Sequence, residues 1–143
     1  MSLKLEEDAL ALNTAAAGSA GTTVDGAAVD MAGYEGVLFF TTIATANAGN
    51  FLKAQGGEAS NLSDAADLAG TKVVAAANGS VVCLEVNRPK ERYIRPNVVR
   101  GGANTAVGDI YQYRYRANNQ PTTNQITNLL VSVSVKSPAE GTP

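Results

Sequence analysis

Residues that could carry out nucleophilic or acid–base catalysis are scarce in this sequence. The 143 residues include thirteen aspartates and glutamates but no histidine, and only one cysteine, Cys83. A nucleophilic side chain needs an activating base, which is most often histidine, and zinc sites draw on histidine and cysteine. Cys83 lies inside the apolar run Ser80–Val86, so we predict that it is a buried small hydrophobic side chain. We therefore expect neither a nucleophile–base pair nor a zinc site.

The acidic residues also lack the arrangement of a known site. Glycoside hydrolysis needs two carboxylates facing one cleft, but most of the acidic residues here fall in expected turns or near the N-terminus. Ser63, Asp64 and Asp67 lie in a long irregular stretch, Gly56–Gly70, without the alternating acidic positions and final glutamate of a calcium loop. A capped turn explains the same residues. We predict that the protein is not an enzyme and binds no metal or cofactor.

Aromatic and cationic side chains alternate most sharply in the segment Asp109–Arg116. On an extended strand, successive side chains point to opposite faces. The two faces would carry Tyr111, Tyr113 and Tyr115 against Gln112, Arg114 and Arg116. Tyrosine beside arginine could stack on sugars or bases, whereas an ordinary sandwich strand would point its aromatics inward and its arginines outward. We favour the ordinary strand.

Charge is unevenly distributed along the chain. Residues 1–35 carry one basic and six acidic residues, whereas residues 85–116 carry seven basic and three acidic residues. These two regions could meet within one molecule or between copies. The formal net charge of -2 argues against nucleic acid as a general partner. The N-terminus has no secretory pattern and no apolar run approaches membrane-spanning length, so we expect synthesis in the cytoplasm and no membrane partner.

The segments that must position these residues are short and extended. Branched and aromatic runs separated by turns rich in Gly, Pro and Asn favour strands over helices. We predict about eight strands, at 22–29, 37–43, 51–55, 71–77, 80–86, 92–100, 109–116 and 129–136. This spacing is typical of a single all-β, antiparallel β-sandwich or jelly-roll-like domain, and less so of a barrel.

Two local features predict how these strands pair. Asn78-Gly79 suits a two-residue hairpin turn, in which both central residues have positive φ. We therefore expect strands 71–77 and 80–86 to pair antiparallel. Pro96 has no N–H to donate, so strand 92–100 should lie at an edge or carry a bulge near the proline.

The two ends of the chain differ in composition from the middle. We predict an N-terminal arm (1–21), a sandwich domain (22–136) and a C-terminal tail (137–143), with flexible arms. Aromatic residues make up only 6% of the chain and tryptophan is absent. The core should therefore be thin and helped by neighbouring subunits. The polar connection 117–128 is long enough to cross a sandwich edge or to reach a neighbouring chain.

Three parts of the sequence together resemble a group of small structural proteins of tailed bacteriophages, which often act as head decoration, or cement, proteins. Each part matches that group in order and spacing: an Asp and a Gly-aromatic turn before an apolar strand, a short strand with a following Ser-Asp loop, and an Arg-Tyr-hydrophobic-Arg strand. They are Val29–Phe40 (VDMAGYEGVLFF), Phe51–Gln55 with Ser63-Asp64 and Asp67–Gly70, and Val86–Arg88 with Glu91–Pro96 (ERYIRP).

This resemblance implies a β-sandwich in the virion that binds the outside of the phage head as a homotrimer and bridges subunits of the major capsid protein. The N-terminal arm, the 88–95 turn region and the 117–128 connection would make the contacts. The residues expected to bind partners are Tyr34, Arg88, Lys90, Arg92, Arg95, Gln120 and Asn124. Two alternatives stay open: a tail or head-to-tail component of a phage, and a carbohydrate-binding sandwich that uses the three tyrosines of segment 109–116.

Overall fold

The computed structural model describes residues 4–122, 132–133 and 139–141. Within them the chain forms one helical turn and twelve strands, which build two six-stranded antiparallel sheets. The elements are α1 (Lys4–Glu7), β1 (Ala9–Thr14), β2 (Ala17–Ala20), β3 (Val24–Asp25), β4 (Val29–Asp30), β5 (Gly36–Ile43), β6 (Asn50–Gly57), β7 (Ala66–Asp67), β8 (Val73–Val74), β9 (Ser80–Asn87), β10 (Tyr93–Arg100), β11 (Thr105–Val107) and β12 (Ile110–Tyr115).

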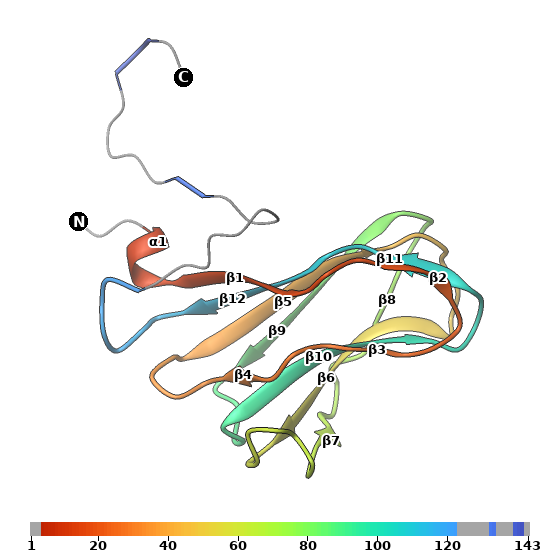
Figure 1. The fold of residues 1–143 in the computed structure, drawn as a ribbon, viewed down its shortest axis with the longest axis horizontal. Helices are drawn as coiled ribbons and strands as arrows, with labels where there is room; N and C mark the ends of the chain where they lie inside the picture. The colour runs from red at the N-terminus through yellow and green to blue at the C-terminus, as the bar shows by residue number, and fades with distance from the viewer. Residues whose placement is uncertain (1–3, 123–131, 134–138, 142–143) are drawn as a thin grey trace.

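The two sheets form the layers of a sandwich (Figure 1). Sheet 1 has the order β1-β12-β5-β11-β2, with β9 on the other side of β5. Sheet 2 has the order β3-β10-β6-β7, with β4 also pairing β10 and β8 also pairing β6. The predicted all-β, antiparallel sandwich is therefore confirmed. The described strands outnumber the predicted eight, partly because some predicted strands are interrupted. Segment 22–29, for example, divides into β3 and β4.

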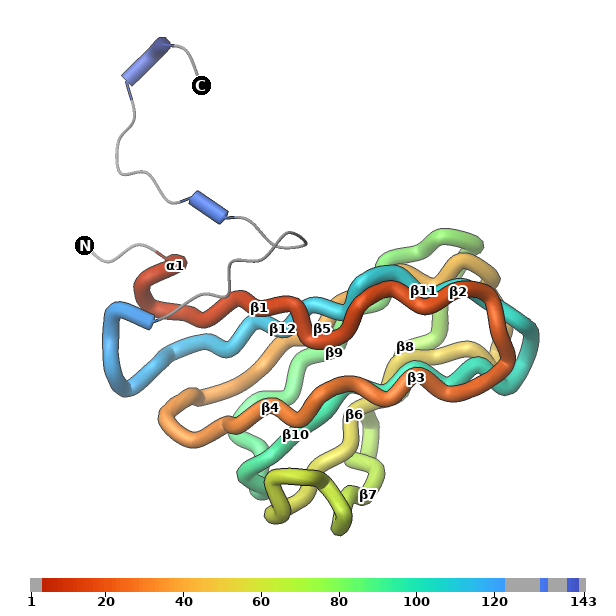
Figure 2. Tube along the Cα trace, in the orientation of Figure 1, coloured from red at the N-terminus to blue at the C-terminus, as the bar shows by residue number. Residues whose placement is uncertain are grey.

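The sandwich begins earlier in the chain than the predicted boundary at Thr22. β1 pairs with β12, and β2 pairs with β11, so much of segment 1–21 belongs to sheet 1. Figure 2 shows this segment running along one layer before the chain crosses and returns through β3 and β4 in the other. The small residues of this segment have weak strand preference. Pairing with the backbone of β11 and β12 determines their conformation.

Asn78-Gly79 does not close the predicted hairpin. β9 pairs with β5 along its full length, whereas β8 pairs with β6 in the other sheet. The turn therefore connects the two sheets. Gly79 has the positive φ of 77° that the sequence suggested, but the Asn78 carboxamide oxygen accepts a hydrogen bond from the Ala46 N–H at 2.8 Å. Only Gly79, and not Asn78, has the positive φ expected of both residues, and the eight-residue ladder to β5 determined the partner of β9.

Pro96 lies in the middle of sheet 2 and not at an edge. β10 is paired in continuous register with β6 on one side and with β3 and β4 on the other. The Pro96 carbonyl accepts a hydrogen bond from the Gly26 N–H at 2.8 Å. The N and C=O of one residue point to the same side of an antiparallel strand, so the missing N–H of Pro96 faces the interruption between β3 and β4. The interruption therefore lies in the neighbouring strand, between β3 and β4. The predicted bulge in β10 is absent, because β10 keeps continuous register with β6.

The core lies between the sheets and is bordered by buried polar residues, of which Arg100 is one. Phe39 and Ile43 from sheet 1 pack with Leu52 and Ile94 from sheet 2, each with 0% of its surface exposed. Arg100, which is 5% exposed, donates to the carbonyl oxygens of Gly18 at 2.7 Å, Thr22 at 2.5 Å and Thr105 at 2.9 Å. These bonds tie the N-terminal segment to the sandwich. The predicted strand 129–136, apart from Ser132 and Val133, lies outside the described residues.

Candidate interaction surface

The strand register of sheet 1 determines which side chains face solvent. Along β5, Val37 and Phe39 are buried in the core, so the alternate residues Leu38 and Phe40 lie on the outer face of the sheet. Residues directly opposite one another in antiparallel strands share a face. Tyr111 lies opposite Phe40, and the tyrosines at alternate positions of β12 therefore all lie on the outer face.

This arrangement reverses the expected orientation of β12. Arg114 lies opposite Val37 and so faces the space between the sheets. Its Nη1 donates to the Asp30 carbonyl oxygen at 3.0 Å, and its guanidinium lies 4.3 Å from the centre of the Tyr34 ring. A carbonyl acceptor and an aromatic ring can hold an arginine between the sheets near their end. The prediction that β12 points its tyrosines inward and its arginines outward is therefore wrong.

The outer face of sheet 1 carries a group of apolar and aromatic side chains that we call the apolar face. Its members are Leu38, Phe40, Val81, Cys83, Tyr111 and Tyr113. The Phe40 and Tyr111 rings stack with centroids 5.3 Å apart, and Val81 is 67% exposed. Cys83 lies opposite Phe40 and is exposed. The prediction of a buried Cys83 is therefore wrong, because its neighbours Val82 and Leu84 are the residues that face the core.

The tyrosine hydroxyls of β12 are engaged within the chain. The Tyr113 hydroxyl donates to Asp8 Oδ2 at 2.5 Å, and Asp8 is 2% exposed. Burial, followed by this bond to a carboxylate, raises the pKa of Tyr113. The Tyr115 hydroxyl donates to Glu85 Oε1 at 2.5 Å and accepts from Asn87 Nδ2 at 2.8 Å. With these two hydroxyls held by the chain itself, the apolar face offers mainly ring and aliphatic surface to a partner.

The outer face of sheet 2 carries more polar side chains than the apolar face does. Lys53 Nζ lies 2.8 Å from both carboxylate oxygens of Asp67, and Arg95 Nε donates to Gln55 Oε1 at 2.8 Å. The Lys53 hydrogen bond is the main reason that the pKa of Asp67 is lowered. Asn97 donates to the Asp25 carboxylate on the same face.

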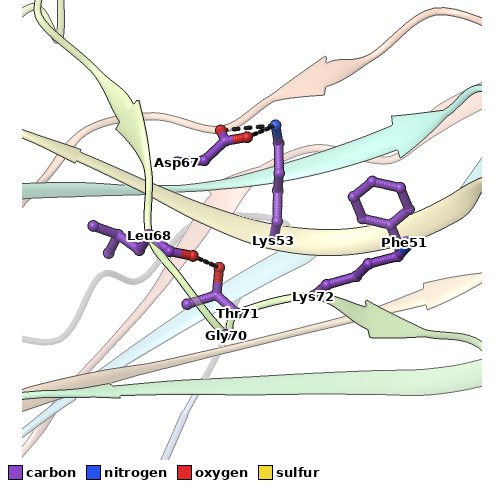
Figure 3. A pocket seen from close by; sticks show the side chains of 7 residues that line it. All are labelled: Phe51, Lys53, Asp67, Leu68, Gly70, Thr71 and Lys72. Carbon is purple, nitrogen blue, oxygen red and sulfur yellow. Dashed lines mark hydrogen bonds and ion pairs between the residues drawn. The ribbon is translucent and has the colours of Figure 1, made fainter.

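A hollow of about 230 Å³ also lies on this side of the molecule (Figure 3). Phe51, Lys53, Asp67, Leu68, Gly70, Thr71 and Lys72 line it. The Lys53 charge is paired with Asp67, and the Thr71 hydroxyl donates to the Leu68 carbonyl oxygen at 2.8 Å. Lys72 Nζ lies 4.5 Å from the centre of the Phe51 ring. The polar groups of the hollow thus bond largely to one another.

The structure brings several of the predicted partner-binding residues into intrachain contacts. Arg92 forms a two-pronged contact with Asp30, with Nε–Oδ1 at 3.1 Å and Nη2–Oδ2 at 3.0 Å. This hydrogen bond is the largest cause of the lowered pKa of Asp30. Arg88 Nη2 lies 3.4 Å from Glu35 Oε1. The acidic N-terminal and basic central regions thus meet within one molecule, which was one of the two arrangements left open.

The remaining predicted residues do not form one cluster. Tyr34 is half-buried against the core beneath Arg114, and Lys90 is exposed in the turn between β9 and β10. Gln120 is exposed in the connection after β12, while Asn124 lies outside the described residues.

The sequence analysis did not find the apolar face. Which face of an alternating strand turns toward the core depends on the neighbouring strands, and the sequence of one strand does not show them.

No three carboxylate or thiol side chains gather into a potential metal site within the described residues. In the same part of the chain, no helix has the length and apolar character needed to cross a membrane.

Comparison with known proteins gives only distant likenesses in fold. No family model matches the chain, and no curated protein does. The SPBc2 prophage-derived protein YomS aligns at a TM-score of 0.44 and 7% identity, covering 80% of this chain and 97% of YomS. A Clostridium thermocellum xylanase 10B structure with CBM22-1 and GH10 modules aligns at a TM-score of 0.44 and 10% identity, covering 87% of this chain and 30% of that one.

A Bacillus endospore appendage protein, from disulfide-linked pili, aligns at a TM-score of 0.37 and 12% identity, covering 82% of this chain and 96% of that chain. At TM-scores below 0.5, none of these likenesses bears on function.

Proposed function

We propose that this protein is a non-enzymatic structural protein of a phage virion, and more specifically a decoration protein on the outside of the head. The observation that carries the proposal is the apolar face. Antiparallel sheets with one face in solvent normally place polar residues on that face, and exposed apolar patches mark interaction sites. The sequence resemblance to phage head decoration proteins supplies the partner, the major capsid protein.

The mode of binding follows from the kind of surface. An outer sheet face of apolar and aromatic side chains suits a broad contact between proteins. On a closed lattice the same modest contact is repeated many times, so the array is stabilised by multivalency without a tight individual site. A homotrimer that bridges capsid subunits would satisfy this geometry.

The test is cosedimentation of the purified protein with expanded phage heads that lack it, across a salt series. We expect saturable binding at a fixed ratio to the capsid protein. Binding should depend only weakly on salt, because apolar contact is not screened and the main charges are paired within the chain. If the protein formed a ring without three-fold symmetry and did not bind heads, a tail or head-to-tail component would be favoured.

Two matched variants connect this test to the apolar face. Val81→Glu places a charge on sheet 1 at a side chain that is 67% exposed, and Val74→Glu places the same charge on the outer face of sheet 2 at a side chain that is 41% exposed. Both should fold. We expect Val81→Glu to weaken head binding by at least ~10-fold, which corresponds to ~1.4 kcal/mol, and Val74→Glu to bind like the wild type. Equal binding by both variants would rule out the apolar face as the docking surface.

Carbohydrate recognition is a second candidate, because the tyrosines of β12 face outward and are only half-buried. Ring stacking is the usual basis of such recognition, and the Phe40–Tyr111 pair offers a platform. Calorimetric titration with host cell-wall oligosaccharides checks this function. Binding that is lost in Tyr111→Ala would support it, and absence of binding to any surface glycan would remove it.

A further inference from the structure

β9 is an edge strand of sheet 1 with one partner among the described residues, β5. At the end of their ladder the Arg88 N–H donates to the Glu35 carbonyl oxygen at 2.8 Å. Backbone groups in an antiparallel strand point alternately toward and away from a given neighbour. The N–H and C=O groups of Val81, Cys83 and Glu85 therefore point away from β5, toward the open side of the sheet.

This edge lacks most of the features that usually protect an exposed strand, although Glu85 places one charge on it. Natural edges are shielded by proline, lysine, bulges or shortness. β9 is eight residues long, contains neither proline nor lysine, and keeps continuous register with β5. Its Val81 side chain is 67% exposed. An edge of this kind is suited to accept an added strand.

The chain itself contains a segment that fits this edge. Residues 129–136 (LLVSVSVK) number eight, like β9, and place branched apolar residues at alternate positions. Val133 in this segment is 83% exposed, the largest value among the exposed large hydrophobic side chains of the described residues, followed by Val81. In an added strand, the Leu/Val side would continue the inward row of β9, and the Ser/Lys side would continue its outer face.

The distance along the chain leaves little slack for pairing with the segment of the same copy. Thr122 is held at the β1 side of sheet 1, where its hydroxyl donates to the Asp8 carbonyl oxygen at 2.7 Å. β9 lies at the opposite side, after β12 and β5. A strand beyond β9 would lie four strand spacings from β1, or ~19 Å. Residues 123–128 could span at most ~24 Å when fully extended, so pairing within one chain would require an almost straight connection.

We propose that the open edge of β9 accepts segment 129–136 from a neighbouring copy of this chain, as an added β-strand. The donor and acceptor are different regions, so each copy can give one strand and receive one. Such a head-to-tail contact closes into a ring when the rotation between copies allows it. This inference does not depend on binding to phage heads.

The single native cysteine makes the contact testable by disulfide crosslinking between full-length chains. One form is the wild type, which has Cys83 on the outer face of β9. The other carries Cys83→Ser with Ser132→Cys, at the middle of the segment and on its polar side. We expect a disulfide between the two forms to appear at least ~10-fold faster than with a control form carrying Cys83→Ser and Ser137→Cys, because pairing raises the local concentration of the thiols.

A second variant examines the backbone of the acceptor strand. Val81→Pro removes an N–H that points away from β5, so the β5 ladder should survive, as checked by circular dichroism. The disulfide between forms should then slow toward the control rate. Equal crosslinking of the Ser132 and Ser137 forms, no effect of the proline, or a link that forms only when both cysteines are in one chain would each overturn the proposal.

Discussion

The two outer faces of the sandwich use strands of equal length but opposite chemistry. β5 and β9 in sheet 1, and β6 and β10 in sheet 2, are all eight residues long and form continuous antiparallel ladders. Sheet 1 shows solvent the apolar face, whereas sheet 2 shows charged and amide side chains that bond to one another. Both sheets contribute side chains to the core, so burial in the core does not account for the difference between their outer faces. A partner bound to the apolar face, as proposed above, would account for it.

The largest expected effect concerns a buried polar contact beside the apolar face. Tyr113→Phe removes the hydroxyl that donates to the buried carboxylate of Asp8. Hydrogen bonds to a charged group contribute ~1.5–3 kcal/mol, so we expect the free energy of unfolding in urea to fall by ~2 kcal/mol. The Asp8 carboxylate would keep its bond from the Arg116 N–H at 2.9 Å, which limits the loss.

Tyr111→Phe is the matched control on the same strand and face. The Tyr111 hydroxyl lies 3.4 Å from Asp109 Oδ2, which is too long for a strong bond. Its removal should change the free energy of unfolding by less than ~0.5 kcal/mol. Equal losses in the two variants would mean that Asp8 does not depend on the Tyr113 hydroxyl.

The polar face should be less sensitive to single substitutions. Lys53→Met removes the ion pair with Asp67, whose side chain is 60% exposed. Exposed ion pairs contribute ~0.2–1 kcal/mol. A double-mutant cycle with Asp67→Asn, measured by urea unfolding, should therefore give a coupling energy below ~1 kcal/mol. A coupling as large as the Tyr113 effect would mean that the polar face, too, is an essential part of the fold.

The sequence predicted the fold class because alternation and turn residues act locally. Val37–Ile43 was predicted to be a strand and forms most of β5. Gly79 and Pro96 show the limit of local rules. Gly79 has a positive φ and Pro96 has no N–H to donate, but long-range ladders determined the partner strands. The same limit applies to Arg114, because alternation defines two faces without saying which one the core will cover.

The surface was harder to predict than the fold. Arg92 and Arg95 were expected to contact partners because they are charged and lie in the Arg-Tyr-hydrophobic-Arg strand that resembles phage decoration proteins. Arg92 contacts Asp30 and Arg95 contacts Gln55, across long sequence separations that a single sequence does not reveal. The apolar face was hidden for a related reason. Leu38 and Phe40 look like core residues in the sequence, and only the burial of Val37 and Phe39 on the other side shows that they face outward.

The smallest predicted effect separates the two faces by pH. The pKa of Asp67 is lowered in the folded protein, chiefly by Lys53, so its contribution to stability is present above the ordinary aspartate pKa of ~4 and is lost as the pH falls through the folded value. The pKa of Tyr113 is raised, so its contribution is present below the ordinary tyrosine pKa of ~10 and is lost as the pH rises through the folded value. Acid should thus weaken the polar face and alkali the apolar face.

Urea unfolding measured from pH 3 to pH 11 can assign each limb of the stability profile to its residue. Lys53→Met should flatten the acid limb slightly and leave the alkaline limb unchanged, because the pKa of Asp67 returns toward its ordinary value. Other lowered carboxyl pKa values, such as that of Asp30, keep part of the acid limb. Tyr113→Phe should flatten the alkaline limb alone. If either variant altered both limbs equally, the polar contacts of the two faces would be coupled through the core and the faces would not be independent surfaces.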